Sequence, residues 1–308
     1  MIKKFLKYCV MSQDSLRKYL YKDLQKYYKK KKITHTKDYI YVIGDIPVLL
    51  VAHLDTVHRN LPKNIWYSLD HDKVMADEGI GGDDRCGVFI INELLERGYR
   101  PYLLFTTDEE VGCLGAENFI IDYPMIDVNC MIELDRRGSN DVVSYGDSND
   151  TLVKIFETLG YKEDFGTYTD ISVLCPHYLI SGVNLSVGYY KAHTTNEYVV
   201  ISEMIATIDK VAKFLDDKNN YNEPVIYEES NRYVDDYWGY DYLYNRKINC
   251  DFCGQVVNTS DCVETPDGVM CLECYYVSQE HYRECKSCGF ITYKNDPCIW
   301  CNSKEEDE

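Results

Sequence analysis

The sequence of 308 residues predicts an α/β domain with a mostly parallel sheet flanked by helices, followed by a small cysteine-rich domain. Two observations support this fold class. Apolar runs of strand length alternate with helical patterns between residues 48 and 134, and this β-α-β-α-β order is typical of parallel sheets with helices on both faces. Eight of the 14 cysteines fall in four C-x-x-C pairs near the C-terminus, a spacing typical of metal sites.

The first elements are read from periodicity and turn signals. Residues Ser12–Tyr28 form a predicted helix, because Leu16, Leu20 and Leu24 recur every four residues and make one apolar stripe. Two strands follow, Tyr39–Ile43 and Val48–Ala52, with a Gly-Asp turn between them. The second strand is continuously apolar, as expected for a strand buried on both faces.

The remaining elements continue the alternation. A helical pattern over Asp84–Arg97 stops at Gly98, where glycine favours a helix end. The later predicted strands are Tyr102–Thr106 and Cys130–Leu134, and the later predicted helices are Ala116–Ile121 and Ser202–Leu215. Further α/β segments are predicted at Leu152–Leu159, Ile171–Leu174 and Leu185–Val187.

Charge limits the partners that we expect. The formal net charge is −18, so a nucleic acid would be repelled and nucleic-acid binding is disfavoured. Residues 1–32 nevertheless hold eleven Lys/Arg against two Asp, which makes +9. We interpret this arm as a solvated amphipathic helix, with a contact to an acidic partner, or to the acidic rest of the chain, as the alternative.

The sequence predicts no membrane association and a cytoplasmic location. No apolar run reaches ~18 residues, the length that a transmembrane helix needs. The basic start lacks the apolar core of a signal peptide, and thiolate metal sites need a reducing compartment.

Acidic residues and histidines follow the predicted strands. His53 and Asp55 follow Val48–Ala52, and Asp135 follows Cys130–Leu134. The others are Asp83 and Asp84 at the start of the next helix, Glu109 and Glu110 after Tyr102–Thr106, and His193 after the stretch Val183–Val187. Since the carboxyl ends of parallel strands meet at one crevice, these side chains are expected to lie together.

Two histidines and three carboxylates, one of them shared, can hold two divalent ions. Such a pair lowers the pKa of a water between the ions, and a carboxylate that stays off the metals can accept the proton of that water. The adjacent Glu109 and Glu110 offer one residue for each task. His35, His58 and His71 are expected to be surface loop histidines.

Five motifs occur in order over residues 33–217: His53-Leu54-Asp55, Gly82-Asp83-Asp84-Arg85-Cys86-Gly87, Asp108-Glu109-Glu110-Val111-Gly112, Glu133-Leu134-Asp135 and Ala192-His193-Thr194-Thr195-Asn196-Glu197. Together they resemble the co-catalytic zinc metallopeptidases of family M20 and its M28 and M42 relatives. The resemblance implies the roles of individual residues. Asp83 would bridge two metals, His53 and Asp135 would complete one site, and Glu110 and His193 would complete the other. Glu109 would be the general base, Asp55 would orient His53, and the Asp83–Asp84 peptide bond would be cis.

One departure from the family concerns its inserted lid domain. Only 57 residues separate Asp135 from His193, too few for the ~100-residue lid of the M20 enzymes, whose histidine helps to stabilise the oxyanion. Tyr189, Tyr190 and His177 are candidates for that role by position. Thr169 and Asp170 occupy the place of a substrate-side loop in the family and are predicted to bind substrate.

The cysteine pairs predict two structural zinc sites, because a segment with so few aliphatic residues needs metal to fold. One site would use Cys250, Cys253, Cys271 and Cys274, and the other Cys285, Cys288, Cys298 and Cys301. Cross-braced pairing of the four cysteine pairs is an alternative to these two ligand sets, and a redox dithiol or an iron–sulfur cluster is an alternative to zinc. Residues 246–308 carry six Lys/Arg against twelve Asp/Glu, which favours a protein partner for this module over a nucleic acid.

The sequence therefore predicts a two-metal amide hydrolase, an exopeptidase acting on peptides or acylated amino acids. The alternatives are an N-deacylase of a small molecule and a zinc-ribbon interaction protein with an inactive hydrolase domain. The predicted divisions are a basic N-terminal helix packed on the catalytic domain (1–32), the catalytic domain (33–217), an acidic tyrosine-rich linker (218–248), a zinc-ribbon-like domain (249–301) and a disordered tail (302–308).

Overall fold

The computed structural model describes residues 2–147, 150–166, 168–228, 247–258, 262–265, 268–278, 281–284, 291–295 and 297. The chain forms two compact units, Met1–Glu229 and Ser230–Glu308. The predicted tail at 302–308 and most of the predicted linker lie outside the described residues. None of the helices within these ranges is both long and apolar enough to cross a membrane.

The first unit is built on an eight-stranded sheet of order β1-β2-β6-β3-β7-β10-β8-β9. The strands are β1 (Ile33–His35), β2 (Tyr39–Val42), β3 (Ile46–His53), β6 (Pro101–Thr106), β7 (Cys130–Arg136), β8 (Asp141–Tyr145), β9 (Lys162–Glu163) and β10 (Gly182–Ser186). The central strands β6, β3, β7 and β10 are parallel, whereas β2 runs antiparallel to β1 and β6, and β8 runs antiparallel to β10 but parallel to β9. The predicted mostly parallel sheet flanked by helices is thus confirmed.

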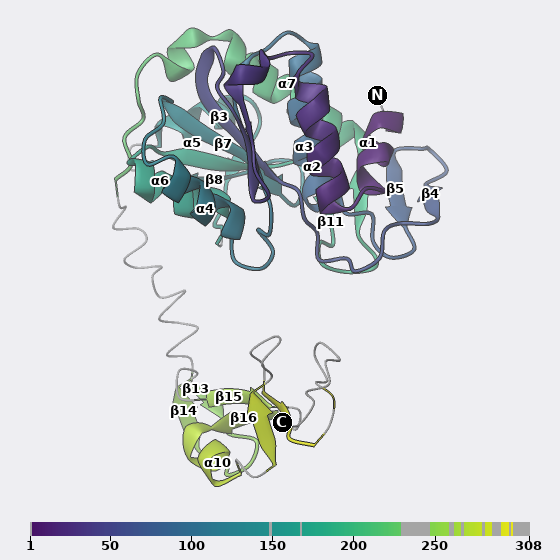
Figure 1. The fold of residues 1–308 in the computed structure, drawn as a ribbon, viewed down its shortest axis with the longest axis vertical. Helices are drawn as coiled ribbons and strands as arrows, with labels where there is room; N and C mark the ends of the chain where they lie inside the picture. Colours follow the sequence, from purple (N-terminus) through teal and green to yellow (C-terminus); the bar gives the residue numbers. More distant parts are fainter. Residues whose placement is uncertain are drawn as a thin grey trace. The chain divides into compact units, whose positions relative to one another are not determined.

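Helices cover both faces of this sheet (Figure 1). One face packs against α1 (Ile2–Cys9), α2 (Gln13–Leu24), α3 (Gly82–Glu96), α5 (Thr151–Thr158) and α7 (Ile201–Asp216), and the other against α4 (Leu114–Asp122) and α6 (Asp170–Tyr178). Strand β3 shows why both faces need cover. Its successive side chains alternate between the two apolar cores, Leu50 on the first and Leu49 and Val51 on the second.

The basic N-terminal arm is part of the first core. Phe5 of α1 and Leu16 and Leu20 of α2 are fully buried, while lysines on the outer face remain exposed or pair with acids, as Lys4 does with Glu93 at 3.3 Å. The arm is therefore amphipathic and packed on the domain. A short 3-10 helix, η1 (Lys30–Lys32), leads from it into β1.

A second, smaller sheet was not predicted. It has the order β11-β12-β5-β4 and consists of β4 (Ile65–Tyr67), β5 (Lys73–Ala76), β11 (Tyr189–Tyr190) and β12 (Tyr198–Val200). This sheet places the loop that carries His193, between β11 and β12, beside the start of α3. After α7, η2 (Lys218–Tyr221) and a bridge between Ile226 and Ile180 keep the chain on the first unit.

In the part of the second unit that the structure describes there are three antiparallel hairpins and one helix. The hairpins pair β13 (Lys247–Asn249) with β14 (Val256–Asn258), β15 (Cys262–Thr265) with β16 (Gly268–Cys271), and β17 (Tyr282–Glu284) with β18 (Ile291–Tyr293). Helix α10 (Leu272–Val277) follows β16. Short hairpins of this size bury little apolar surface, so another source of stability is needed.

Candidate active site

His53, the last residue of β3, lies at the centre of the cluster. Its side chain is 1% exposed, because parallel neighbours flank β3 on both sides. Its Nε2 atom lies 3.0 Å from Asp83 Oδ1 and 3.5 Å from Asp135 Oδ1. On the other side of the ring, Nδ1 lies 3.2 Å from Asp55 Oδ1, a contact that fixes the ring orientation.

Asp83, at the start of α3, faces two histidines with its two carboxylate oxygens. Oδ1 is directed at His53, and Oδ2 lies 3.2 Å from His193 Nε2. The peptide bond between Asp83 and Asp84 is cis, as the resemblance implied. Asp84 is fully buried and its Oδ1 accepts a hydrogen bond from the Gly87 N–H at 2.9 Å, so it caps the helix.

The loop after β6 carries Glu109 and Glu110. Both of their backbone N–H groups donate to the carboxylate of Asp55, at 3.1 and 3.0 Å. Glu110 Oε2 lies 3.0 Å from His193 Nε2. Its Oε1 is buried with no hydrogen-bond partner in the structure. An unsatisfied carboxylate oxygen is costly in such a place, which indicates that a cation belongs there.

Asp135 lies near the end of β7 and is held by the neighbouring strand. Its N–H donates to Asn184 Oδ1 at 3.0 Å, and Asn184 Nδ2 donates back to its carbonyl at 2.9 Å. The Tyr189 hydroxyl donates to Asp135 Oδ1 at 3.1 Å. These three bonds fix the carboxylate beside His53.

His193 comes from the loop between β11 and β12 and has a positive φ of 63°. Few residues other than glycine adopt this conformation, and it is found mainly at functional sites. The side chain of His193 is 57% exposed, so it closes the cluster on its open side.

The cluster has donor sets that fit two divalent cations. Possible ligand atoms of His53, Asp83 and Asp135 lie within 4.8 Å of one another, and so do those of Asp83, Glu110 and His193. Asp83 belongs to both sets. A third set, His53, Glu109 and Glu110, meets the same criterion, but using it would take His53 away from Asp83 and Asp135, which lie beside it. We therefore favour the two sets that share Asp83.

The electrostatics of the metal-free cluster match this interpretation. Burial raises the pKa of Glu109 to about 7 and that of Glu110 to about 6. The hydrogen bond to Asp83 raises the pKa of His193 to about 9. Burial alone would raise the pKa of Asp55, but the contact with His53 and the two N–H groups lower it. The site thus holds protons that a cation would displace.

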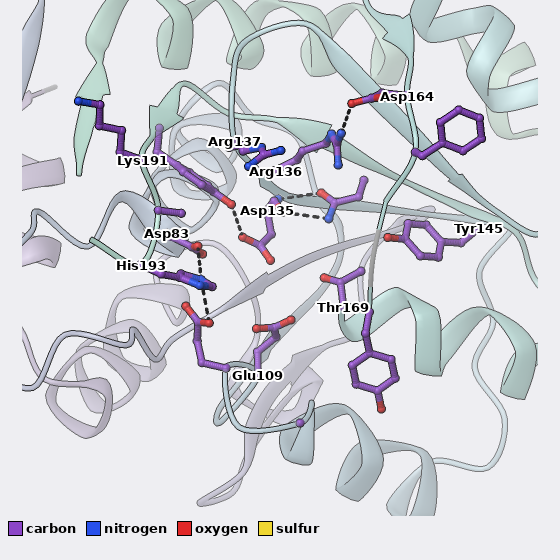
Figure 2. Close-up of a pocket in the computed structure, with 17 residues that line it drawn as sticks. Asp83, Glu109, Asp135, Arg136, Arg137, Tyr145, Asp164, Thr169, Lys191 and His193 are labelled. Carbon is purple, nitrogen blue, oxygen red and sulfur yellow. Dashed lines mark hydrogen bonds and ion pairs between the residues drawn. The ribbon is translucent and has the colours of Figure 1, made fainter. Parts of the chain in front are cut away.

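A cavity of about 700 Å³ opens onto this cluster (Figure 2). Of the predicted substrate-binding residues, Thr169 and Tyr189 line it. Asp170 is fully buried behind the wall, where it accepts a hydrogen bond from Thr106. Tyr190 is outside the lining, with its hydroxyl donating to Glu203 at 2.6 Å. His177 is exposed on α6, in contact with the ring of Tyr178.

Glu197 supports the cluster, although the sequence motif assigned it no role. It is fully buried, and it accepts hydrogen bonds from the N–H groups of Gly81 at 2.7 Å and Asp83 at 3.0 Å. His58 Nε2 lies 2.8 Å from the same carboxylate. The expectation that His58 is a surface histidine is therefore wrong, because its side chain is 9% exposed.

The N-terminal arm also reaches the motif-bearing loops. The buried Arg85 donates to the carbonyls of Leu54 at 2.5 Å and Met11 at 3.2 Å. Gln13 makes two hydrogen bonds with Asp108. The Asp108 N–H donates to Gln13 Oε1 at 3.2 Å, and Gln13 Nε2 donates to Asp108 Oδ1 at 3.0 Å. Sequence reasoning missed both residues, because nothing in the sequence around Arg85 or Gln13 indicates these contacts.

In the second unit, Cys250, Cys253, Cys271 and Cys274 have sulfur atoms within 4.8 Å of one another. Cys253 Sγ lies 3.8 Å from Cys271 Sγ, the separation expected for two thiolates on one tetrahedral zinc, where Zn–S is about 2.3 Å. A hydrogen bond from the Cys271 N–H lowers the pKa of Cys250 to about 6. Cys285, Cys288, Cys298 and Cys301 lie outside the described residues.

Comparisons with known proteins agree with this geometry. Residues 35–164 match the model of peptidase family M28. No curated protein sequence matches the chain.

Similar solved structures include the aminopeptidase PepT from Bacillus cereus (12% identity, TM-score 0.52, 70% of this chain and 97% of that chain). A tripeptidase from Staphylococcus aureus (13% identity, TM-score 0.54, 70% and 96%) and an aminopeptidase from the archaeon Desulfurococcus kamchatkensis (13% identity, TM-score 0.57, 70% and 94%) are also similar. These likenesses show a shared zinc-exopeptidase-like fold.

Proposed function

We propose that the chain, whose residues 35–164 match the model of peptidase family M28, is a two-metal amide hydrolase that acts as an exopeptidase. The observation that carries the proposal is the position of Asp83, whose two carboxylate oxygens face His53 and His193. A carboxylate shared between two ligand sets is what a pair of divalent ions requires.

The ligand sets assign each residue a task. His53 and Asp135 would hold one ion, Glu110 and His193 the other, and Asp83 both. Two bound ions, zinc by the family resemblance, would polarise the scissile carbonyl and make a water molecule more acidic. Asp55 accepts a hydrogen bond from the protonated Nδ1 of His53. This contact keeps His53 in the tautomer whose Nε2 carries no proton and is free to bind a metal ion.

Glu109 would move the proton. It lines the cavity beside the ligands but belongs to neither set that shares Asp83. The carboxylate would accept a proton from the attacking water and then donate it to the leaving amine. Within the described residues, the side chain of Glu109 accepts one hydrogen bond, from Cys113 Sγ to Oε1 at 3.8 Å. Its other oxygen, Oε2, is therefore available to water and substrate.

Tyr189 is better assigned to positioning than to oxyanion stabilisation. Its hydroxyl already donates to Asp135, so it holds a ligand in place. Thr169 lines the cavity, which supports its predicted contact with substrate, although its hydroxyl oxygen is itself buried.

For the second unit we propose a structural zinc in the four-cysteine cluster, with a protein partner as the role of the module. The spacing of Cys253 and Cys271 supports the zinc. The second zinc at Cys285, Cys288, Cys298 and Cys301 and the cytoplasmic location rest on the sequence.

The test is turnover of defined amides. The metal-loaded full chain is incubated with aminoacyl, dipeptide and N-acetyl-amino-acid substrates, and so is Glu109→Gln. We expect release of amino acids from the end of a peptide by the unaltered protein, and a loss on the order of a hundredfold or more in the variant. Preferential turnover of N-acetyl substrates would favour an N-deacylase. If no amide is cleaved while both ions are bound, the hydrolase domain is inactive and the proposal is wrong.

A further inference from the structure

The cavity at the active site has two chemically different sides. Glu109, Glu110 and the metal-ligand cluster form one side. Arg136, Arg137 and Lys191 also line the cavity, and we call these three residues the cationic rim. Figure 2 shows Arg136 and Arg137 on the opposite side of Asp135 from Glu109.

The three rim charges face few acidic partners. Arg136 forms an ion pair with Asp164, and its Nε lies 3.8 Å from Asp141 Oδ2. The charge of Arg137 also acts on Asp164, where it helps to lower the pKa of that carboxyl, but within the described residues neither Arg137 nor Lys191 forms an ion pair or a side-chain hydrogen bond. Their charges are therefore available to a ligand in the cavity.

The backbone that carries Arg137 is held in place. Ser186 Oγ donates to the Arg137 carbonyl at 2.7 Å, and the Gly138 N–H donates to the Tyr189 carbonyl at 2.8 Å. The turn is thus fixed to β10 and to the small sheet on both sides of Arg137. Because its backbone is fixed, the Arg137 side chain can present its charge to a ligand at a defined position.

With two divalent ions bound, the charge around the cavity would favour an anion. The lining holds three cations against five carboxylates, Asp83, Glu109, Glu110, Asp135 and Asp164, so the side chains alone sum to −2 and two divalent ions would bring the sum to +2. Like charges destabilise one another unless an anion lies between them. A substrate that carries a negative group would supply that anion.

Distance along β7 limits where the negative group can be. Asp135 and Arg137 are two residues apart, so their Cα atoms are separated by about 7 Å if the chain is extended. One residue of an extended substrate covers about half of that distance. A group about two residues along the substrate from an amide at the ligand cluster therefore lies beside the rim.

We propose that the cationic rim binds a carboxylate of the substrate, located within about two residues of the bond that is cleaved. The inference rests on the proposed amide hydrolase function and deepens it. A carboxylate suits a guanidinium, which can donate two parallel hydrogen bonds to its two oxygens. The carboxylate could be the C-terminus of a peptide or an Asp or Glu side chain, because the rim contacts are the same for both.

The test compares three peptides of one sequence on the full metal-loaded chain: the free C-terminus, the C-terminal amide, and the amide with a Glu next to the cleaved bond. Equilibrium binding is measured on Glu109→Gln and kinetics on the protein with Glu109. We expect the carboxylate peptides to bind more tightly than the plain amide. Arg137→Gln should weaken their binding and raise their KM, on the order of ten- to a hundredfold, with little change for the plain amide. Arg137→Lys should restore part of the loss.

Lys22→Gln, on the exposed face of α2, is the matched control and should change neither quantity. Preference for the free terminus or for the Glu peptide identifies the source of the carboxylate. Equal binding of all three peptides, absence of binding, or a preference that Arg137→Gln leaves intact would each overturn the inference. Absence of turnover with a retained carboxylate preference would instead overturn the hydrolase function alone.

Discussion

Asp55 connects the two main motifs of the site through one carboxylate. It lies 3.2 Å from His53 Nδ1 and accepts hydrogen bonds from the N–H groups of Glu109 and Glu110. The orientation of a metal ligand and the path of the loop that carries the base therefore depend on the same two oxygen atoms.

Asp55→Asn should reduce the metal affinity of the active site without abolishing metal binding. The amide keeps one acceptor oxygen but loses the charge that orients His53, so we expect metal affinity and kcat to fall by about ten- to a hundredfold each. Competition with a chelator measures the affinity. Asp45→Asn, an exposed residue paired with Lys32, is the control, and an unchanged affinity in Asp55→Asn would contradict the assigned role.

Metal uptake should release protons. Without a metal the pKa of His193 is raised to about 9 and that of Glu109 to about 7, so at neutral pH His193 holds its proton and Glu109 is protonated in about half of the molecules. A cation displaces these protons, and affinity therefore rises with pH until the groups lose them unaided. Calorimetry in two buffers of different ionisation enthalpy measures the number released. We expect a smaller number for His193→Ala, and no release by either protein would show that the ligands do not titrate in this way.

The ligand cluster could be predicted from the sequence because its members follow strands that end at one edge of the sheet. His53, Asp135 and the Glu109-Glu110 pair carry that signal. The supporting roles of Glu197 and Asn184 could not be predicted from the sequence. Both residues act through hydrogen bonds to Asp83 and Asp135, and these bonds form only when the chain has folded. Arg136 and Arg137 stand directly after Asp135 in an acidic chain, and that local excess of charge was a signal that could have been used.

Among the elements, α3 is the one whose position decides the geometry of the site. It begins at Gly82, carries Asp83 in its first turn, and packs against β7. The close approach depends on Gly87, where an added Cβ would lie 2.2 Å from the Leu134 carbonyl and 2.5 Å from Asp84 Oδ2.

Gly87→Ala should therefore move α3 away from β7 and separate Asp83 from Asp135. The free energy of unfolding should fall by about 1–3 kcal/mol, and affinity at the active site should fall with it. Chemical denaturation and chelator competition give the two values. Glu157→Ala on the exposed face of α5 should change neither, and a stable Gly87→Ala with intact metal binding would refute the close contact.

The long elements could be predicted and the short ones could not. Strand β3 and helix α3 have strong apolar patterns over many residues. The small sheet has strands of two to four residues, too short to show a period, and β12 pairs with β5 from over a hundred residues away. Helix α1 spans only eight residues and escaped prediction for the same reason.

At the scale of the whole molecule, two kinds of candidate metal-binding cluster lie in two separate units. The first uses carboxylates and histidines suited to reactive ions, and the second uses four cysteines suited to a closed structural site. We therefore expect that substitutions in the first cluster reduce amide hydrolysis, and that substitutions in the four-cysteine cluster reduce the stability of the second unit.

Cys250→Ser should remove the metal of the second unit and leave amide hydrolysis in place. The thiolate is one of four ligands, and a small metal-dependent fold unfolds when the ion is lost. Metal analysis should show one ion fewer per chain, and limited proteolysis should cut the second unit first. Cys9→Ala, a buried thiol of the first unit, should keep the full metal count, whereas loss of hydrolysis in Cys250→Ser would mean that the units are not independent.

Anomalous scattering from crystals of the zinc-loaded protein tests the central claim most directly. The account predicts two peaks in the first unit, both within about 2.0–2.2 Å of an Asp83 oxygen, one also bound by His53 and Asp135 and the other by Glu110 and His193. A single peak in the first unit, or two peaks with Asp83 bound to neither or to only one, would contradict the two-metal site.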